Sequence, residues 1–151
     1  MNIKYYIKKY NQLTTNEFHD LLALRINVFV VEQNCPYAEL DGKDKKAIHV
    51  FGVDKNNKIV AVARILPKGI SYKELSIGRV ATHLSVRHQK IGIELMQQCM
   101  AFIKCNYPTE NVRISAQSHL EKFYTKFGFE STGKTYLEDN IPHTEMLYQP
   151  N

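Results

Sequence analysis

IGRVATHLSVRHQKIGI, the stretch from residue 77 to residue 93, decides the fold. A strand pattern over Leu75–Thr82 passes through a short polar loop into an amphipathic helical pattern that begins at Ile91. The first amides of a helix have no partner inside it, and the helix dipole adds about half a positive charge there. The stretch therefore predicts an anion-binding loop, with added charge from Arg87 and Lys90. A strand, a basic turn and a helix also occur together without a ligand, so composition alone leaves both readings open.

Predicted elements flank this stretch on both sides. Upstream are a strand, a helix with Thr14 or Thr15 as its N-cap, a turn-rich loop and an antiparallel hairpin, at Ile3–Tyr10, Phe18–Gln33, Pro36–Lys46 and Ala47–Leu66. Downstream are a helix, a short buried strand, a helix capped by Ser118 and ended by Gly128, and two strands, at Ile91–Ile103, Val112–Ala116, Ser118–Phe127, Thr132–Leu137 and Thr144–Tyr148. This order predicts a single α/β domain over residues 1–151, of the mixed α+β kind, with helices packed on a mixed sheet.

Composition narrows the class of protein. The 151 residues are 44% hydrophobic and 23% charged, as in an ordinary globular domain. No run approaches the ~20 apolar residues of a membrane helix, and no signal peptide is visible, so no membrane association is expected. The three cysteines lack C-x-x-C spacing, which favours the reducing cytoplasm over a disulfide framework. His83 and His88 are separated by a loop without a completing acid or cysteine, so no metal is expected.

The net charge of +5 suits a polyanionic partner, either nucleic acid or a phosphate-rich cofactor. Scattered lysines are more typical of a solvated surface. No basic stripe interleaved with aromatic residues is visible, so we expect no nucleic-acid partner.

The decisive stretch resembles the signature of the GNAT acyltransferase superfamily. Arg87-x-x-Lys90-x-Gly92 is similar to its R/Q-x-x-G-x-G/A motif, and Phe123-Tyr124-x-x-Phe127-Gly128-Phe129 is similar to the ending that usually follows. The resemblance implies one GNAT-type domain with a central, largely antiparallel sheet, splayed strands four and five, and acetyl-CoA as acyl donor. The implied cofactor-binding positions are Val80, Ala81, Thr82, Arg87, His88, Gln89, Lys90, Ile91, Gly92, Ile93, Gln117 and Tyr124.

Further motifs are similar to the ElaA group of this superfamily. They include Leu24-Arg25-x-x-Val28-Phe29-Val30-Val31-Glu32-Gln33-x-Cys35-Pro36-Tyr37, Asp41-Gly42-x-Asp44 and Ile141-Pro142-His143. Lys90 departs from the superfamily pattern, because it stands where the first signature glycine is usual. Glycine tolerates a positive φ and lysine does not, which leaves the loop conformation open at this position.

Acyl transfer to an amine needs an uncharged nucleophile, a partner for the oxyanion and a proton for the leaving thiolate. The resemblance assigns the last role, general acid, to Tyr124. A phenol has a reference pKa of about 10 and a thiol one of about 8.5, a mismatch that a local shift would narrow. The oxyanion is expected at a backbone N–H of Val80 to Thr82.

The base is the least defined role. Some relatives carry a glutamate near the position of Ser76, and serine cannot act as a base unaided. Glu32 is the favoured candidate, as base or as acceptor-binding group, among the acids that follow the first helix. The other candidates in this loop are Glu39, Asp41 and Asp44. All four are more typical of solvated acids, and they would also hold a cationic acceptor by charge alone.

Other polar residues admit structural as well as catalytic roles. Histidine has a reference pKa near working pH, so His119 or His143 would serve as base or shuttle, although satisfied structural histidines are commoner. Cys35 stands beside a proline turn, where a cysteine is more often packed than nucleophilic. Three arginines interrupt apolar patterns and are expected to pair internally with nearby acids, namely Arg25, Arg64 and Arg79.

The sequence thus predicts an enzyme that acetylates a primary amine on a small molecule or peptide by direct attack in a ternary complex. The alternative is a non-catalytic CoA-binding sensor or interaction module, which the absence of an obvious base favours and Tyr124 opposes. A monomer and a homodimer are both compatible with the sequence.

Overall fold

The computed structural model describes residues 2–151, which form seven strands and three α-helices joined by short 3-10 and π-helical segments. The strands are β1 (Lys4–Lys9), β2 (Ile48–Val53), β3 (Ile59–Leu66), β4 (Ser76–Thr82), β5 (Val112–Gln117), β6 (Phe129–Glu138) and β7 (Ile141–Tyr148). The helices are α1 (Thr15–Ile26), α2 (Ile91–Asn106) and α3 (Glu121–Thr125). The shorter segments are η1 (Tyr10–Gln12), η2 (Asn27–Glu32), η3 (Lys43–Lys46), η4 (Leu84–Val86) and η5 (Ser118–Leu120).

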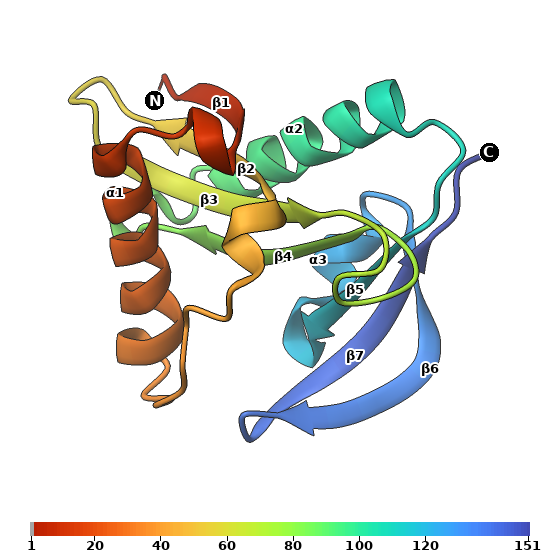
Figure 1. Cartoon of the computed structure of the whole chain (residues 1–151). Coiled ribbons are helices and arrows are strands. Elements are labelled where there is room, and N and C mark those ends of the chain that lie inside the picture. Colours follow the sequence, from red (N-terminus) through yellow and green to blue (C-terminus); the bar gives the residue numbers. More distant parts are fainter. Residues whose placement is uncertain (1) are drawn as a thin grey trace.

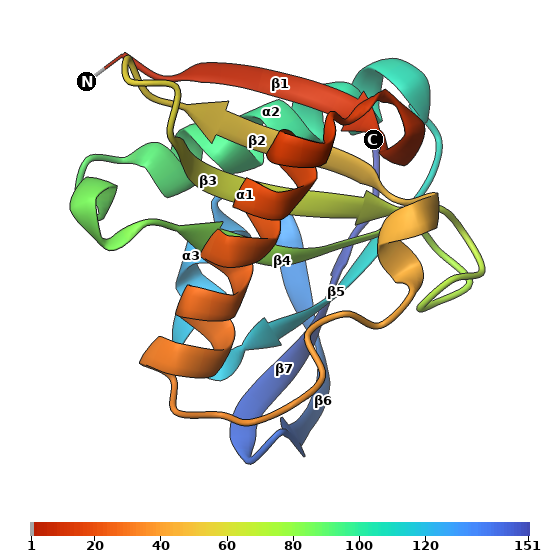
Figure 2. The same ribbon diagram turned by 60° about the vertical axis from the view of Figure 1, so that its left-hand side comes forward.

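The strands form two antiparallel sheets, one of four strands in the order β1-β2-β3-β4 and one of three in the order β5-β7-β6. An isolated parallel bridge between Leu75 and Val112 joins them, and the Arg113 amide donates to the Leu75 carbonyl over 2.8 Å. Past this bridge β4 and β5 diverge (Figure 1 and Figure 2). The expected splay of strands four and five is therefore confirmed.

Helix α1 packs on one face of the four-stranded sheet. Its N-cap is Thr14, whose hydroxyl accepts from the Glu17 amide while the Glu17 carboxylate accepts from the Thr14 amide. Leu21 and Leu24 are buried against this face, with Phe51 of β2 in the same cluster. Because strand side chains alternate between faces, the neighbours of Phe51 along β2 point to the other side of the sheet.

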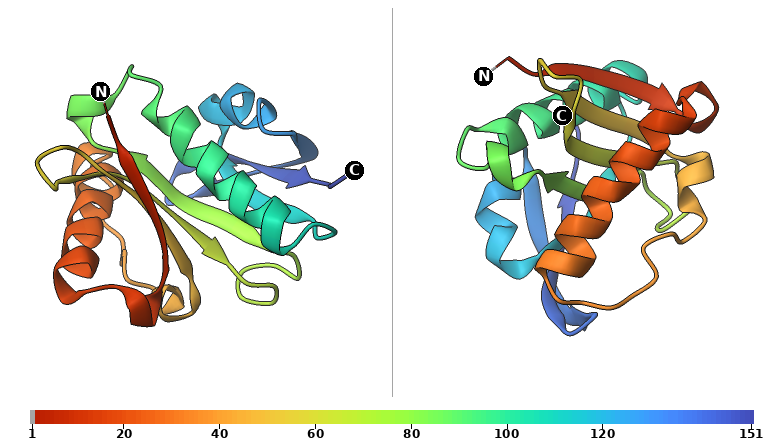
Figure 3. Two further views of the ribbon diagram at one scale, coloured as in Figure 1. Left: turned by 90° about the horizontal axis from the view of Figure 1, so that it is seen from above. Right: turned by 90° about the vertical axis from the view of Figure 1, so that its left-hand side faces the viewer.

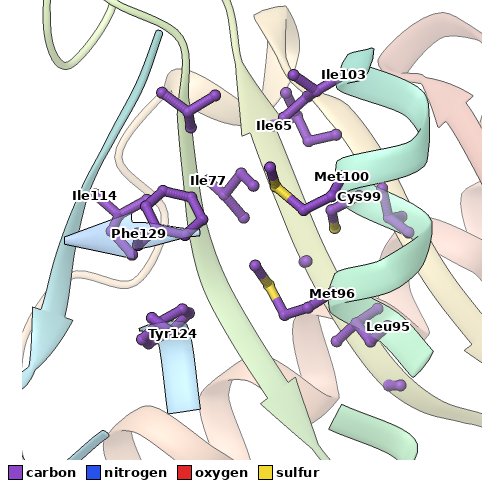
Figure 4. Packing of buried hydrophobic residues seen from close by; sticks show 14 of the residues in the cluster. Ile65, Ile77, Leu95, Met96, Cys99, Met100, Ile103, Ile114, Tyr124 and Phe129 are labelled. Atoms are coloured by element: carbon purple, nitrogen blue, oxygen red, sulfur yellow. The ribbon is translucent and has the colours of Figure 1, made fainter. Parts of the chain in front are cut away.

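Helix α2 covers that other side, opposite α1 (Figure 3). Its buried stripe is Leu95, Met96, Cys99, Met100 and Ile103. These side chains pack against Ile65 of β3 and Ile77 of β4, and the same core continues to Phe129 and to Tyr124 of α3 (Figure 4). One apolar core thus joins both sheets and places α3 beside the gap between β4 and β5.

Several predicted boundaries change in the structure. The helical stretch reaches Glu32 as expected, but its last six residues wind as the π-helical η2. Ser118 does not cap an α-helix; it begins η5, and its hydroxyl bonds the Thr144 hydroxyl over 2.9 Å. The last two strands begin three residues earlier than predicted, because Phe129 pairs with Tyr148 at one end of their hairpin and Ile141 pairs with Glu138 at the other. Within residues 2–151, no helix combines the length and apolarity that crossing a bilayer requires.

Candidate active site

Strand β4 is paired on one edge only. On that edge a bulge sets Arg79 and Val80 against Ala63 of β3, because Val62 pairs with Ala81 and Arg64 pairs with Gly78. Arg79 has a φ of 52°, in the left-handed region, and bulges of this kind bend and twist a strand. The other edge faces the gap toward β5, so backbone groups that point there are available to a ligand.

The loop after β4 leads through η4 into α2. The Gln89 amide donates to the Val86 carbonyl over 3.3 Å, and the Glu94 amide donates to the Lys90 carbonyl over 3.1 Å. The amides of residues 91–93 precede this first helical bond and have no acceptor inside the helix. They stand at the positive end of a 16-residue helix, where an anion is stabilised.

Lys90 is the N-cap of α2 and has a φ of 62°. His88, two residues earlier, has a φ of 71°. The loop therefore keeps the left-handed conformation at Lys90 that a glycine would adopt, although a lysine adopts it only with strain. This answers the question that the sequence left open and corrects the expectation that lysine would not accept a positive φ.

Arg87 is already engaged within the protein. Its Nε and Nη2 donate to the Thr82 carbonyl over 3.2 and 3.0 Å, and its Nη1 pairs with a Glu32 carboxylate oxygen at 2.7 Å. Both charged side chains are about one-third exposed. Glu32 consequently lies beside the anion-binding loop, and it does not border the cavity described next.

A cavity of about 500 Å³ lies where β4 and β5 diverge. Its walls come from β4, β5, α3, the β6–β7 turn and the loop that follows η2. It brings together three of the predicted cofactor-binding residues, namely Val80, Gln117 and Tyr124, and its lining also holds the candidate catalytic residues Cys35, Asp41 and His143. The predicted positions of the anion-binding loop lie at the far end of the same strand edge, outside the cavity lining.

Tyr124 is buried, at 8% exposure, and borders the cavity. Its ring packs against Phe123 and Phe129, at centroid distances of 5.1 and 6.3 Å. Burial raises the pKa of Tyr124 above its ordinary value, with a further contribution from Cys99. The raised pKa of Tyr124 lies further from the pKa of a thiol than the ordinary phenol value does. The expected shift of the Tyr124 pKa toward the thiol value is therefore wrong. It also keeps the hydroxyl protonated throughout the working pH range.

A network of ion pairs forms part of one wall of the cavity, because Asp41, Arg64 and Arg79 are in its lining. Arg25 is almost fully buried; its Nε donates to Glu39 over 2.6 Å and its Nη1 to Asp44 over 2.7 Å. Arg64 donates to Asp41 over 2.9 Å and to Asp44 over 3.1 Å. This network fastens the loop after η2 to the sheet.

Arg79 completes the network. Its Nε donates to Glu39 over 2.9 Å, and its guanidinium lies over the Tyr37 ring at 5.6 Å. The internal pairing expected for the three arginines is confirmed. The expectation that Glu39 and Asp44 are solvated is wrong, because both are 4% exposed and bonded to arginine. Three positive charges match the three carboxylates, so these acids present little net charge to a cationic acceptor.

The β6–β7 turn supplies cavity residues that the sequence analysis missed. Glu138 and Asp139 line the cavity, and within residues 2–151 neither pairs with an arginine or lysine. The Cys35 thiol donates to the Asp139 carbonyl over 3.5 Å, linking the loop after η2 to this turn. Asp139-Asn140 between two β-rich segments was the available signal for the turn.

The two histidines singled out from the sequence have different settings. His119 is exposed on η5, whereas His143 is buried on β7 and borders the cavity. In the described part of the chain, no three His, Cys, Asp or Glu side chains gather as a metal site requires.

Comparisons with known proteins agree with this geometry. The model of the acetyltransferase (GNAT) domain family matches residues 16–149. The Escherichia coli protein ElaA is 40% identical over 139 residues, covering 91% of this chain and 90% of ElaA. The crystal structure of ElaA superposes with a TM-score of 0.91, covering 98% of this chain and all of ElaA at 37% identity.

A second solved structure is equally similar in fold. An acyl-CoA N-acyltransferase from Pseudomonas aeruginosa superposes with a TM-score of 0.91 at 34% identity, covering 97% of this chain and 99% of that protein. A Synechocystis protein of the UPF0039 group is 37% identical over 149 residues, covering 99% of this chain and 97% of that protein.

The strain at Lys90 predicts that Lys90→Gly stabilises the protein. Relief of the left-handed strain exceeds the added entropy of unfolded glycine by about 0.5–1 kcal/mol. Urea unfolding measures the change. Gln97→Gly, at an exposed position inside α2, is the matched control and should cost roughly 0.5–1 kcal/mol. Destabilisation by Lys90→Gly would show that Lys90 is held by contacts worth more than the strain.

The ion network predicts acid sensitivity. Burial raises the pKa of Asp44, but hydrogen bonds and charge from Arg25 and Arg64 outweigh it, so the pKa of Asp44 lies below its ordinary value. The pKa of Asp41 is lowered in the same way, chiefly by Arg64 against the effect of burial. At acid pH the unfolded chain then binds more protons than the folded one. Stability is complete above the unfolded value of about 3.9 and is lost as pH falls below it.

Urea unfolding between pH 7 and pH 3 tests this acid sensitivity. The free energy of unfolding should fall most steeply below about pH 4, and Asp44→Asn should reduce that slope. Asp20→Asn is the control, because Asp20 pairs only with His19 on an exposed face and should leave the slope unchanged. Equal slopes in Asp44→Asn and the wild type would contradict the assignment.

Proposed function

Because this chain belongs to the acetyltransferase (GNAT) family, we propose that it transfers an acetyl group from acetyl-CoA to a primary amine. Acyl-CoA-dependent acyl transfer is the general chemistry of this family. The finer proposal is that the amine attacks the thioester directly while both substrates are bound. The acceptor is a small molecule or a peptide, and the products are an amide and free CoA.

The observation that supports the proposal most strongly is the open edge of β4. It leads from the anion-binding end of α2 to the cavity that holds the protonated phenol of Tyr124. The amides of residues 91–93 suit the CoA pyrophosphate, and the edge of β4 at Val80 to Thr82 suits the peptide-like amides of pantetheine. A thioester at the end of pantetheine would then enter the cavity where Gln117 and Tyr124 lie. Backbone N–H groups near the β4 bulge would face its carbonyl oxygen.

The roles of the loop side chains follow from their contacts. Arg87 is held by the Thr82 carbonyl and by Glu32, so it reaches a phosphate only if it exchanges the Glu32 partner. The remaining predicted loop positions, His88, Gln89 and Lys90, contribute mainly backbone and charge. Glu32 lies beside the donor loop, which favours a role in positioning Arg87 over its earlier assignment as base or acceptor-binding group.

The acceptor side is assigned from charge. The network acids are neutralised by arginines, whereas Glu138 and Asp139 border the cavity without such partners. Carboxylates attract an ammonium group, so an amine that is protonated in solution would concentrate here. This supports an amine acceptor that approaches from the β6–β7 turn, opposite the donor loop.

The proposal is tested by mixing the protein with acetyl-CoA and a panel of amines, amino acids, polyamines and peptides while following thiol release. At least one primary amine should release CoA and yield its N-acetyl product by mass spectrometry. The matching tertiary amine should release none, because it cannot form a stable amide. CoA binding without release by any acceptor would favour the sensor alternative instead.

Tyr124→Phe should lower kcat by roughly 10²-fold while leaving acetyl-CoA affinity nearly unchanged. The physical reason is that the thiolate loses its proton donor, whereas the buried ring and its packing remain. Tyr107→Phe, at a partly exposed position after α2, is the control and should retain wild-type kcat. An unchanged kcat in Tyr124→Phe would remove Tyr124 from the mechanism.

A further inference from the structure

His143 lies on the middle strand of the second sheet and lines the cavity. It lies on β7, in register with Gln117 of β5 on one side and Tyr136 of β6 on the other. The residue is 7% exposed, and it borders the same cavity as Tyr124. A buried histidine at this position is therefore within the space that the acceptor amine and the thioester would share.

The ring of His143 is fixed in orientation. Nδ1 lies 2.7 Å from the Ile141 carbonyl oxygen, and the ring stacks on Tyr136 with a centroid distance of 6.1 Å and an angle of 15°. Tyr136 is itself anchored, since its hydroxyl donates to Ser115. A carbonyl oxygen can only accept, so Nδ1 carries the proton and Nε2 of the neutral ring is a hydrogen-bond acceptor.

The Nε2 atom faces a carboxylate. It lies 3.3 Å from a Glu138 oxygen, and the Glu138 side chain is about half exposed. Neutral Nε2 and an ionised carboxylate are both acceptors, so the pair lacks a proton between them. Either a proton on the ring or an ammonium group from outside would satisfy both atoms. The arrangement suits a site that receives a proton from an incoming amine.

The other candidate bases have settings that make proton transfer less direct. Glu39, Asp41 and Asp44 are held by arginines. Glu32 pairs with Arg87, and Ser76 carries only a hydroxyl. His119 is exposed and does not border the cavity.

We propose that His143 is the general base of the acetyl transfer, an assignment that rests on the proposed function. The bound ammonium first loses one proton to solvent, and the neutral amine nitrogen then forms a bond to the acetyl carbon while the C–S bond breaks. One N–H proton of the attacking nitrogen passes to Nε2 of His143, and the leaving thiolate takes the hydroxyl proton of Tyr124. Solvent then removes the proton from His143 and restores that of Tyr124. Glu138 acts as a positioning residue, because its charge stabilises the protonated ring and draws the amine to Nε2.

The pH dependence of this step depends on the ionisable groups around the ring. Tyr136 stacks on the ring from the strand beside it. The ionisable groups that line the same cavity are Cys35, Tyr37, Asp41, Lys43, Arg64, Tyr72, Arg79, Tyr124, Glu138 and Asp139. Burial raises the pKa of Tyr72 and of Tyr124, so these phenols stay neutral at working pH. The carboxylates of this set are Asp41, Glu138 and Asp139, and Asp41 is paired with Arg64 and Arg79.

His143→Gln is the direct test, with the pH profile of kcat/KM as readout. In the wild type the pH profile of kcat/KM should have two limbs. One is a fall at acid pH as an imidazole protonates, and the other comes from the acceptor amine, at pH ~10 for a lysine-like amine. His143→Gln should lower kcat by roughly 10²-fold at pH 7 and lose the imidazole limb. His119→Gln is the matched control and should keep both the rate and the limb. Added imidazole should restore part of the lost rate.

Urea unfolding and CoA affinity show whether His143→Gln is folded. If it is not, Glu138→Gln is the second test of the proposal. It should move the imidazole limb to lower pH and raise the KM for the amine, because the ring loses its neighbouring negative charge. A His143→Gln variant with wild-type rate and profile, or an unmoved limb in Glu138→Gln, would overturn the assignment. A wild type that releases no thiol with any amine would instead overturn the proposed function, and the assignment with it.

Discussion

The structure depends on the divergence of β4 from β5. Strands in one sheet satisfy each other's backbone groups, but past the bridge between Leu75 and Val112 these two strands no longer pair. An unpaired strand edge inside a protein carries a free-energy cost unless water or a ligand bonds it. That constraint creates the cavity and leaves β4 ready to bind an extended, amide-bearing chain. It also explains why one apolar core, built around α2 and reaching Phe129, must hold both sheets together.

The ion network solves a second problem, which is how to hold a polar loop against the sheet. Arg25 and Arg64 are buried and would be costly alone, but each bonds two carboxylates of that loop. The cancellation of charge has a functional consequence. It leaves the β6–β7 turn, with Glu138 and Asp139, as the acidic side of the cavity. Donor and acceptor would then enter from different ends of the gap, so neither needs to leave for the other to bind.

Much of the fold was predictable because its signals are local. The N-cap expected at Thr14 or Thr15, the Asp54–Lys58 turn and the apolar stripe of α2 each act within a few residues, and the structure confirms them, with Thr14 as the cap. The divergence of β4 and β5 was expected only from the resemblance to the GNAT superfamily, because no local sequence pattern encodes it. The burial of Glu39 and Asp44 was missed, because it depends on an arginine distant in the sequence. The π-helical turn of η2 was missed as well. The same reason applies to His143. Its setting depends on Gln117 and Tyr136 of the neighbouring strands, which a single histidine in the sequence does not reveal.

A crystal structure of the complex with CoA tests the central claim most directly, namely that the open edge of β4 and the end of α2 form one donor site. The account predicts pyrophosphate oxygens within about 2.7–3.2 Å of the amides of residues 91–93. It also predicts pantetheine along Val80 to Thr82, with its sulfur in the cavity beside Tyr124. CoA bound at any other place, with these amides and the β4 edge left free, would contradict it.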